Sequence, residues 1–305
     1  MAEEKVKEES FVNKGVSFFW KYLLGGIIPT AILTFILLII GANVSTFIIS
    51  EPFGRFMTED HPTLSTGLSY MGSIGVWVVI LIIYLILRNR REYLKKILNR
   101  FNKKTAICLL VGLVIGVGLN LICAFAAMLN KDISLYFNDF NVLSCIFLLI
   151  SVFVQASSEE LLCRGFMYRR IETFYNQPIV PIIANSAFFA VLHGLNPGVT
   201  IVSLMNIFLT GILFSCLYYY TDSISLCFTG HTGWNFCQSI ILGLPNSGVV
   251  VPYSFMKLDA ANARNSLFYN CAFGVDGTVF SVIILGLACV VVIVLGRKGI
   301  IRKAR

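Results

Sequence analysis

The sequence predicts an all-α, polytopic membrane protein, and three observations lead to this fold class. Of the 305 residues, 57% are hydrophobic and only 13% are charged, which is too little polar surface to cover a soluble domain of this length. The mean hydropathy of +0.80 points the same way. The apolar residues also gather in long runs, and about 20 such residues let a helix cross roughly 30 Å of hydrocarbon.

Eight apolar runs predict a bundle of eight transmembrane helices in one integral membrane domain that covers residues 1–305. The expected helices are 23–49, 66–87, 105–129, 142–163, 179–195, 199–220, 222–243 and 277–297. The fourth is expected to continue as a helix past Arg170, because no helix breaker precedes Pro178. Residues 244–276 are polar and are expected to form a loop or cap.

The distribution of positive charge predicts which ends face the cytoplasm. The 88–104 connection carries eight Lys and Arg residues, whereas the 50–65 connection has one Arg beside three acidic residues. Short cytoplasmic loops carry the excess of positive charge, so both the N- and C-termini are expected in the cytoplasm. The first twenty residues lack the features of a signal peptide, so we expect them to be retained. The protein is expected in the cell membrane if its source is bacterial.

The distribution of charge argues against a nucleic-acid-binding protein, and the spacing of the cysteines argues against a domain held by disulfides or zinc. The formal charge of +8 arises mainly from the connections between apolar runs, so the expected partner is the lipid bilayer and no nucleic acid is expected. The nine cysteines are scattered singly without a Cys-x-x-Cys pair. This spacing predicts neither a disulfide framework nor a zinc knuckle.

Two adjacent carboxylates, Glu159 and Glu160, lie near the end of the fourth apolar run. An ionisable group costs at least about 2.5 kcal/mol at the bilayer centre, so each needs a structural or functional reason. Glu160 and Arg164 are four residues apart and can pair on one helix face. Glu159 points about 100° away from Glu160 and is free to act as a general base. The alternative is a helix end that emerges among lipid headgroups.

Two of the three histidines, His193 and His231, lie in apolar runs, whereas His61 lies in a charged connection. His231 and Asn235 are four residues apart and therefore share one face of the seventh helix. An imidazole and an amide at one point suit the stabilisation of an oxyanion. Hydrogen bonds between helices are the alternative role for such residues in membranes.

Three motifs in this order resemble those of the CPBP family, also called Abi. They are Glu159-Glu160-x-x-x-Arg164, Phe189-x-x-x-His193 and His231-x-x-x-Asn235. The family comprises CAAX-processing endopeptidases, which trim prenylated proteins, and bacterial relatives linked to bacteriocin processing or self-immunity. The resemblance covers about residues 142–243. It implies that four catalytic residues face one intramembrane cavity: Glu159, His193, His231 and Asn235. Glu160 and Arg164 would support them.

Under this hypothesis the protein is an intramembrane endopeptidase that needs no cofactor. Glu159 would activate a water as general base, His193 would hold that water, and His231 with Asn235 would stabilise the oxyanion. Glu160 and Arg164 would orient the base. The substrate would be a hydrophobic or prenylated peptide or protein. A zinc enzyme is the alternative, with Glu159, His193 and His231 as ligands. The lack of a His-Glu-x-x-His motif favours the metal-free form.

Two other classes remain open, together with one geometric difficulty. Buried polar residues also suit an ion- or proton-coupled transporter, and a non-catalytic membrane immunity protein could keep the same residues for binding. A straight fifth helix from Ile179 would carry His193 about 20 Å along its axis, beyond the depth expected for Glu159. Tilt, a deeper start of the fifth helix or an unwound fourth helix would bring these two side chains together.

Overall fold

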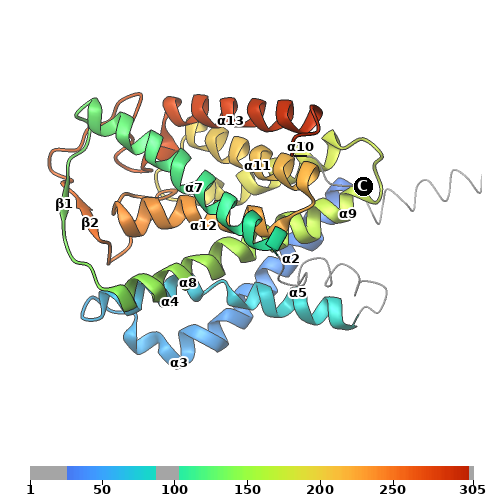
Figure 1. Cartoon of the computed structure of the whole chain (residues 1–305). Helices are drawn as coiled ribbons and strands as arrows, with labels where there is room; N and C mark the ends of the chain where they lie inside the picture. Colours follow the sequence, from blue (N-terminus) through green and yellow to red (C-terminus); the bar gives the residue numbers. More distant parts are fainter. Residues whose placement is uncertain (1–25, 87–102, 302–305) are drawn as a thin grey trace, which may run out of the picture.

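A computed structural model describes residues 26–86 and 103–301 (Figure 1). The helices lie side by side in one bundle. Its first half consists of α2 (Ile27–Ser45), η1 (Thr46–Ser50), α3 (Glu51–Phe53), η2 (Gly54–Phe56), α4 (Pro62–Met71), α5 (Ile74–Ile86), α7 (Lys103–Leu129), strand β1 (Leu135–Phe137) and α8 (Val142–Glu160). The second half consists of η4 (Leu161–Tyr168), α9 (Arg169–Glu172), α10 (Ile179–Leu192), η5 (His193–Leu195), α11 (Ile201–Thr221), α12 (Ile224–Asn235), η6 (Phe236–Ile241), strand β2 (Met256–Leu258), η7 (Val275–Gly277) and α13 (Val279–Arg297).

Within the described residues, six helical segments are long and apolar enough to cross a membrane. They are Ile27–Phe56, Pro62–Ile86, Lys103–Leu129, Val142–Glu172, Ile201–Thr221 and Val279–Arg297. The predicted fifth helix corresponds to the shorter apolar segment Ile179–Leu195. The predicted seventh corresponds to α12 followed by η6. The polytopic helical fold is therefore confirmed, and the protein is an integral, multi-pass membrane protein. The N-terminus, most of the basic 88–104 connection and the last basic residues lie outside the described residues, so the orientation of the bundle stays a prediction.

The fourth helix runs without a break from α8 through the π-helical η4 into α9. This continuation was predicted, and it bears on how Glu159 and His193 come to lie at a similar depth in the bundle. At about 1.5 Å per residue, Glu159 lies about 20 Å from the end of α9, and His193 lies about 20 Å from the start of α10. By this count the two side chains lie at about the same level, and both line one cavity.

Glycines set the close packing of α7 against α12, the helix that carries His231. A Cβ atom at Gly116 would lie 1.9 Å from the backbone oxygen of Gly230, and one at Gly112 would lie 2.3 Å from that of Leu226. A side chain at either position would push the two helices apart. The absence of side chains at these crossings thus fixes the position of α12 in the bundle, as small residues do at helix interfaces in membranes.

The segment 242–278 folds back over one end of the bundle as a cap. Its strand β2 pairs antiparallel with β1, with Tyr136 opposite Lys257, and Figure 1 shows this pair at the end of the bundle away from the last helix turn of α13. Residues 244–276 were predicted to form a loop or cap. The structure shows that it also enters the bundle, because Phe273 and Val275 are fully buried.

Candidate active site

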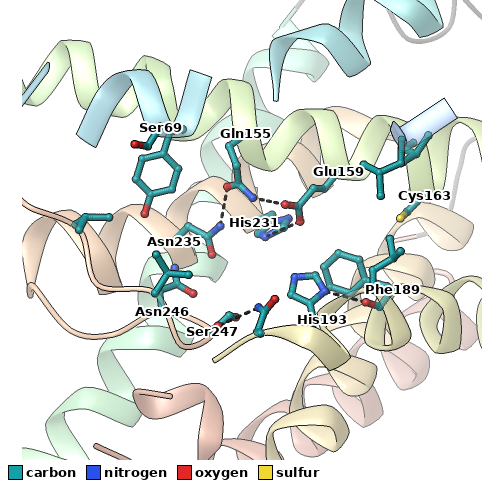
Figure 2. Close-up of a pocket in the computed structure, with 17 residues that line it drawn as sticks. Ser69, Gln155, Glu159, Cys163, Phe189, His193, His231, Asn235, Asn246 and Ser247 are labelled. Carbon is teal, nitrogen blue, oxygen red and sulfur yellow. Dashed lines mark hydrogen bonds and ion pairs between the residues drawn. The ribbon is translucent and has the colours of Figure 1, made fainter. Parts of the chain in front are cut away.

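A mainly apolar cavity of about 400 Å³ with several polar side chains in its wall lies between α2, α4, α8, α10, α12 and the cap (Figure 2). The structure brings all four predicted catalytic side chains to its wall: Glu159, His193, His231 and Asn235. Apolar side chains line the rest of one side, among them Leu38, Leu162 and Leu192. A cavity of this size with a few convergent polar groups has the character of a ligand or catalytic site.

Gln155 connects two of these residues and was missed by the sequence reasoning. Its Nε2 donates a hydrogen bond to Oε1 of Glu159, and its Oε1 accepts one from Nδ2 of Asn235 at 3.0 Å. The available signal was its spacing, because a polar residue four positions before Glu159 lies on the same face of α8. Gln155 therefore fixes one oxygen of Glu159 and the orientation of the Asn235 amide.

The second oxygen of Glu159, Oε2, is buried and makes no hydrogen bond with any residue that the structure describes. It lies 3.9 Å from Nε2 of His231. A buried carboxylate oxygen without a donor is costly. This atom is therefore the one able to take a proton from a water or another group inside the cavity.

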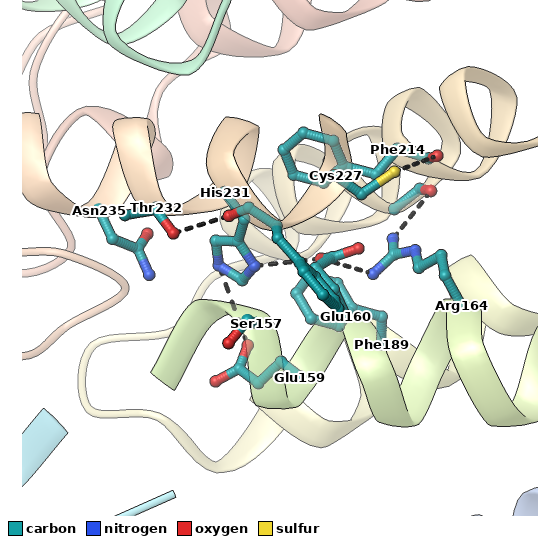
Figure 3. A network of polar contacts seen from close by, with 12 residues as sticks. Ser157, Glu159, Glu160, Arg164, Phe189, Phe214, Cys227, His231, Thr232 and Asn235 are labelled. Carbon is teal, nitrogen blue, oxygen red and sulfur yellow. Dashed lines mark hydrogen bonds and ion pairs between the residues drawn. The ribbon is translucent and has the colours of Figure 1, made fainter. Parts of the chain in front are cut away.

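His231 is oriented by Glu160, as Figure 3 shows. Its Nδ1 lies 3.1 Å from Oε1 of Glu160, so Nδ1–H donates to the carboxylate and Nε2 points toward Glu159. Glu160 also accepts a hydrogen bond from Arg164 at 2.9 Å, and both members of this ion pair are fully buried. The predicted Glu160–Arg164 pair is present. However, Glu160 contacts His231 and not the base Glu159, because the turn of about 100° between adjacent residues aims the two carboxylates at different helices.

Arg164 is held on several sides. Its Nη2 donates to the carbonyl oxygen of Gly211 at 3.0 Å, and its guanidinium lies 5.0 Å from the ring centroid of Phe189 and 5.8 Å from that of Phe214. The Phe214 ring in turn stacks on His231. Such cation–π contacts are stronger when the groups are desolvated. The arginine thus balances the charge of Glu160 and supports the His231 ring.

His193 begins η5 at the end of α10, and its tautomer follows from one contact. Its Nδ1 lies 2.8 Å from the carbonyl oxygen of Phe189. A carbonyl only accepts, so Nδ1 carries the proton and Nε2 is left with its lone pair. Figure 2 shows the ring on the opposite side of the cavity from Glu159. His193 can therefore accept a hydrogen bond from a group in the cavity.

The cap reaches the cavity through Asn246 and Ser247, whose positions no pattern in the sequence predicts. Buried Asp276 accepts hydrogen bonds from the Ser247 backbone N–H at 2.9 Å and from Trp234 Nε1 at 2.9 Å. Burial raises the pKa of the Asp276 carboxyl, and its hydrogen bonds oppose that rise. The same carboxylate accepts from Gln238 Nε2 at 3.1 Å. Asp276 thereby ties the cap to the helix that carries His231 and Asn235.

The positions of the possible metal ligands bear on the alternative hypothesis that the site binds zinc. Among the residues described, no three His, Cys, Asp or Glu side chains form a group able to hold a metal ion. Glu159 and His231 approach each other, whereas the Nδ1 of His193 is committed to a backbone carbonyl. Two of the three proposed zinc ligands are close together in this arrangement.

The fold and the site together define a helical membrane protein. Between its helices lies a partly apolar cavity that is lined by several ionisable side chains. Residues 141–237 match the family model described as Type II CAAX prenyl endopeptidase Rce1-like. This segment contains all three motifs, and the match supports the resemblance to the CPBP family that these motifs indicate. The matched family is one of CAAX prenyl endopeptidases. No curated protein and no solved structure matches the chain.

Proposed function

We propose that the protein hydrolyses a peptide bond within the membrane by means of a water that Glu159 activates. The observation that carries this proposal is the geometry of Glu159. One of its oxygens is held by Gln155, and the other is buried, unpaired and 3.9 Å from Nε2 of His231. A carboxylate with one free oxygen in a cavity suits proton abstraction from water.

The remaining side chains supply the other requirements of amide hydrolysis. Nε2 of His193 accepts a hydrogen bond from the attacking water and orients it. Asn235 donates to the oxyanion that forms when the water oxygen bonds to the carbonyl carbon. His231 donates from Nε2 when it is an imidazolium, whose charge Glu160 balances. Glu159 then passes the proton to the leaving amine as the C–N bond breaks. Loss of one oxyanion donor typically costs on the order of 100-fold in rate.

The substrate proposed is a hydrophobic or prenylated peptide that reaches the cavity from the bilayer. The mixture of apolar side chains and polar groups around the cavity suits a peptide whose side chains are apolar and whose backbone is polar. Transport of an ion or proton and non-catalytic immunity are the competing functions. Both predict that the peptide is not cut.

Cleavage by matched variants tests the proposal. The wild type, Glu159→Gln and His193→Ala would be purified in nanodiscs and incubated with a panel of apolar and farnesylated peptides, and products would be detected by mass spectrometry. His61→Ala is the matched control, because His61 is exposed in the connection after η2. We expect the wild type and the control to cut one or more peptides, with cleavage lost in both active-site variants.

Two results would contradict the proposal. Equal cleavage by all four proteins would show that this cavity is not the active site. A loss of activity on chelation that zinc restores, with the protein intact, would establish the zinc mechanism in place of the metal-free one. Protection against a toxic peptide that survives Glu159→Gln would instead favour immunity through binding.

A further inference from the structure

A segment of the cap that belongs to no helix or strand borders the candidate catalytic cavity. Val249 and Val251 line the cavity and Val250 between them does not, and this alternation is that of a β-strand, in which successive side chains point to opposite faces. Val249 and Val250 are 53% and 67% exposed. We call Val249–Val251 the 249–251 edge.

Both ends of the 249–251 edge are anchored, so its backbone has a defined position. On one side, Asn246 and Val249 exchange two backbone hydrogen bonds of 2.9 Å. Ser247 and Gly248 between them have φ values of +49° and +85°, the signs that a tight two-residue hairpin turn requires. On the other side, the Tyr253 N–H donates to Oγ1 of Thr66 at 3.1 Å.

The turn itself is bound to the site. Its Ser247 N–H donates to Asp276, and its Ser247 carbonyl oxygen accepts from Asn196 at 2.9 Å, three residues after His193. Asn246 donates from its side chain to Ser239 at 3.2 Å. The 249–251 edge is therefore fixed relative to both His193 and α12.

The backbone groups of Val250 are free in spite of this anchoring. Neither its N–H nor its C=O, nor those of Val251, makes a hydrogen bond with another residue that the structure describes. In a strand, the N–H and C=O of one residue point to the same edge and those of the next residue point to the opposite edge. Because Val249 faces Asn246 in the turn, Val250 presents its donor and acceptor on the open edge.

A peptide that is to be cut has the complementary groups. Each residue of an extended peptide in the cavity exposes an N–H and a C=O that are costly to leave unpaired in an apolar environment. A fixed strand edge satisfies such groups, as in other proteins that bind a peptide by adding it to an exposed edge.

We propose that the 249–251 edge binds the substrate as an added β-strand, with the N–H and C=O of Val250 paired to one substrate residue. This inference rests on the proposed function, because the occupant is the extended peptide that is cleaved. Val249 and Val251 then contact the substrate side chains that face the cavity.

The test compares Val250→Pro, which lacks the N–H, with Val250→Ala, which keeps it. Both would be made in the full chain carrying Glu159→Gln, and the dissociation constant of a fluorescent farnesylated CAAX-type peptide would be measured in nanodiscs. We expect Val250→Pro to bind about tenfold more weakly than Val250→Ala, since one backbone hydrogen bond is lost and its acceptor is left unpaired. Thermal unfolding of both variants checks that the fold is retained.

A scan of the peptide gives a second measurement with the protein unchanged at Val250. Each backbone nitrogen of the peptide would be methylated in turn. If the peptide pairs with the 249–251 edge, N-methylation should weaken binding at every second residue of the peptide. This is because only every second residue of a strand faces the partner edge. Equal binding by the two Val250 variants, together with N-methyl effects that do not alternate, would overturn the proposal.

The outcomes separate this proposal from the proposed function. If the chain with native Glu159 cuts the peptide and the proline effect is absent, the edge pairing is wrong and the peptidase assignment stands. If binding depends on Val250 as expected and native Glu159 produces no cleavage, the edge pairing stands and the peptidase assignment fails. A peptide that fails to bind to any variant contradicts both.

Discussion

At the scale of single residues, the active site depends on how each polar atom is engaged. Glu160 and Arg164 are both fully buried and paired, and breaking such a pair typically costs 3–5 kcal/mol because it leaves an uncompensated charge. Glu159, in contrast, keeps one oxygen free of any hydrogen bond to the described residues. Two adjacent glutamates thus differ in role because one is neutralised by an arginine and the other is turned toward the cavity.

Gln155 is predicted to position the general base and an oxyanion donor together. Gln155→Met keeps the length of the side chain and removes both hydrogen bonds, one of them to a charged group, which is worth about 1.5–3 kcal/mol. We expect kcat to fall by about 10- to 100-fold with little change in KM, because the interaction orients reacting groups more than it binds substrate. Steady-state cleavage kinetics measure this.

The matched control is Gln177→Met, at an exposed position before α10. Wild-type kcat in Gln155→Met would show that Gln155 has no positioning role. A fall in thermal stability without a change in kcat would show that its role is structural only.

At the scale of helices, the sequence predicted the existence of the elements better than their ends. The fourth helix was placed at 142–163 with an expected continuation, and the structure extends it to Glu172. The fifth helix was predicted at 179–195, and the structure has an apolar helical segment at Ile179–Leu195, within which α10 changes to the 3-10 turn η5 at His193. The chain then turns into α11, and His193 lines the same cavity as Glu159.

Gly116 is predicted to be essential for the packing of α7 on α12. In Gly116→Ala, the new Cβ would meet the backbone of Gly230 at 1.9 Å, and a backbone cannot move as a flexible side chain can. We expect a loss of about 1–3 kcal/mol in stability and lower activity, since α12 carries His231 and Asn235. Thermal unfolding and cleavage rate would be measured together.

Gly118→Ala provides the control, because a Cβ atom at Gly118 meets nothing within 4 Å. In a helix, replacing Gly by Ala is otherwise favourable by about 1 kcal/mol. If Gly116→Ala were as stable as Gly118→Ala, the close crossing of the two helices would be wrong.

The cap is the element whose role the sequence indicated least. Its polar composition predicted a loop, and nothing in the order of its residues indicated that Asn246 and Ser247 would line the cavity. These contacts depend on Asp276, which is some thirty residues from Ser247 in sequence and adjacent to it only in the fold. Pairings of this kind arise from tertiary structure and leave no local pattern.

Asp276→Asn is predicted to loosen the cap. Asparagine offers one acceptor oxygen where the carboxylate accepts from Trp234 on one oxygen and from Gln238 and Ser247 on the other. A buried donor left unpaired costs about 1–3 kcal/mol, so we expect a lower unfolding temperature and a higher KM. Asp60→Asn, at an exposed position, is the control. Unchanged KM and stability in Asp276→Asn would show that the cap is held by other contacts.

At the scale of the whole molecule, composition alone predicted a membrane protein, and three short motifs indicated the family that residues 141–237 match. The motifs were sufficient because catalysis depends on side chains at fixed spacing along helices, and this spacing is visible in the sequence. The contacts of Gln155, the cap residues and the contact of Glu160 with His231 were not visible, because they depend on which helices face one another.

The orientation of the bundle is a prediction at this scale. The excess of Lys and Arg at 88–104 predicts that the C-terminus is cytoplasmic and that the cap lies outside. An epitope inserted after Ala261, which is exposed in the cap, should be labelled by antibody in intact cells, whereas a C-terminal epitope should require permeabilised cells. The reverse pattern would invert the predicted topology.

The central claim is that Glu159 activates water in this cavity without a metal ion. The most direct measurement is kcat/KM for one cleaved peptide with the wild type and Glu159→Gln, each with and without a chelator, at matched folding. We predict a fall of at least about 1000-fold in Glu159→Gln, since both proton transfer and the placement of water are lost, and no effect of the chelator on the wild type. A Glu159→Gln variant that keeps more than about a tenth of wild-type kcat/KM, a margin of 1.4 kcal/mol, would contradict the claim.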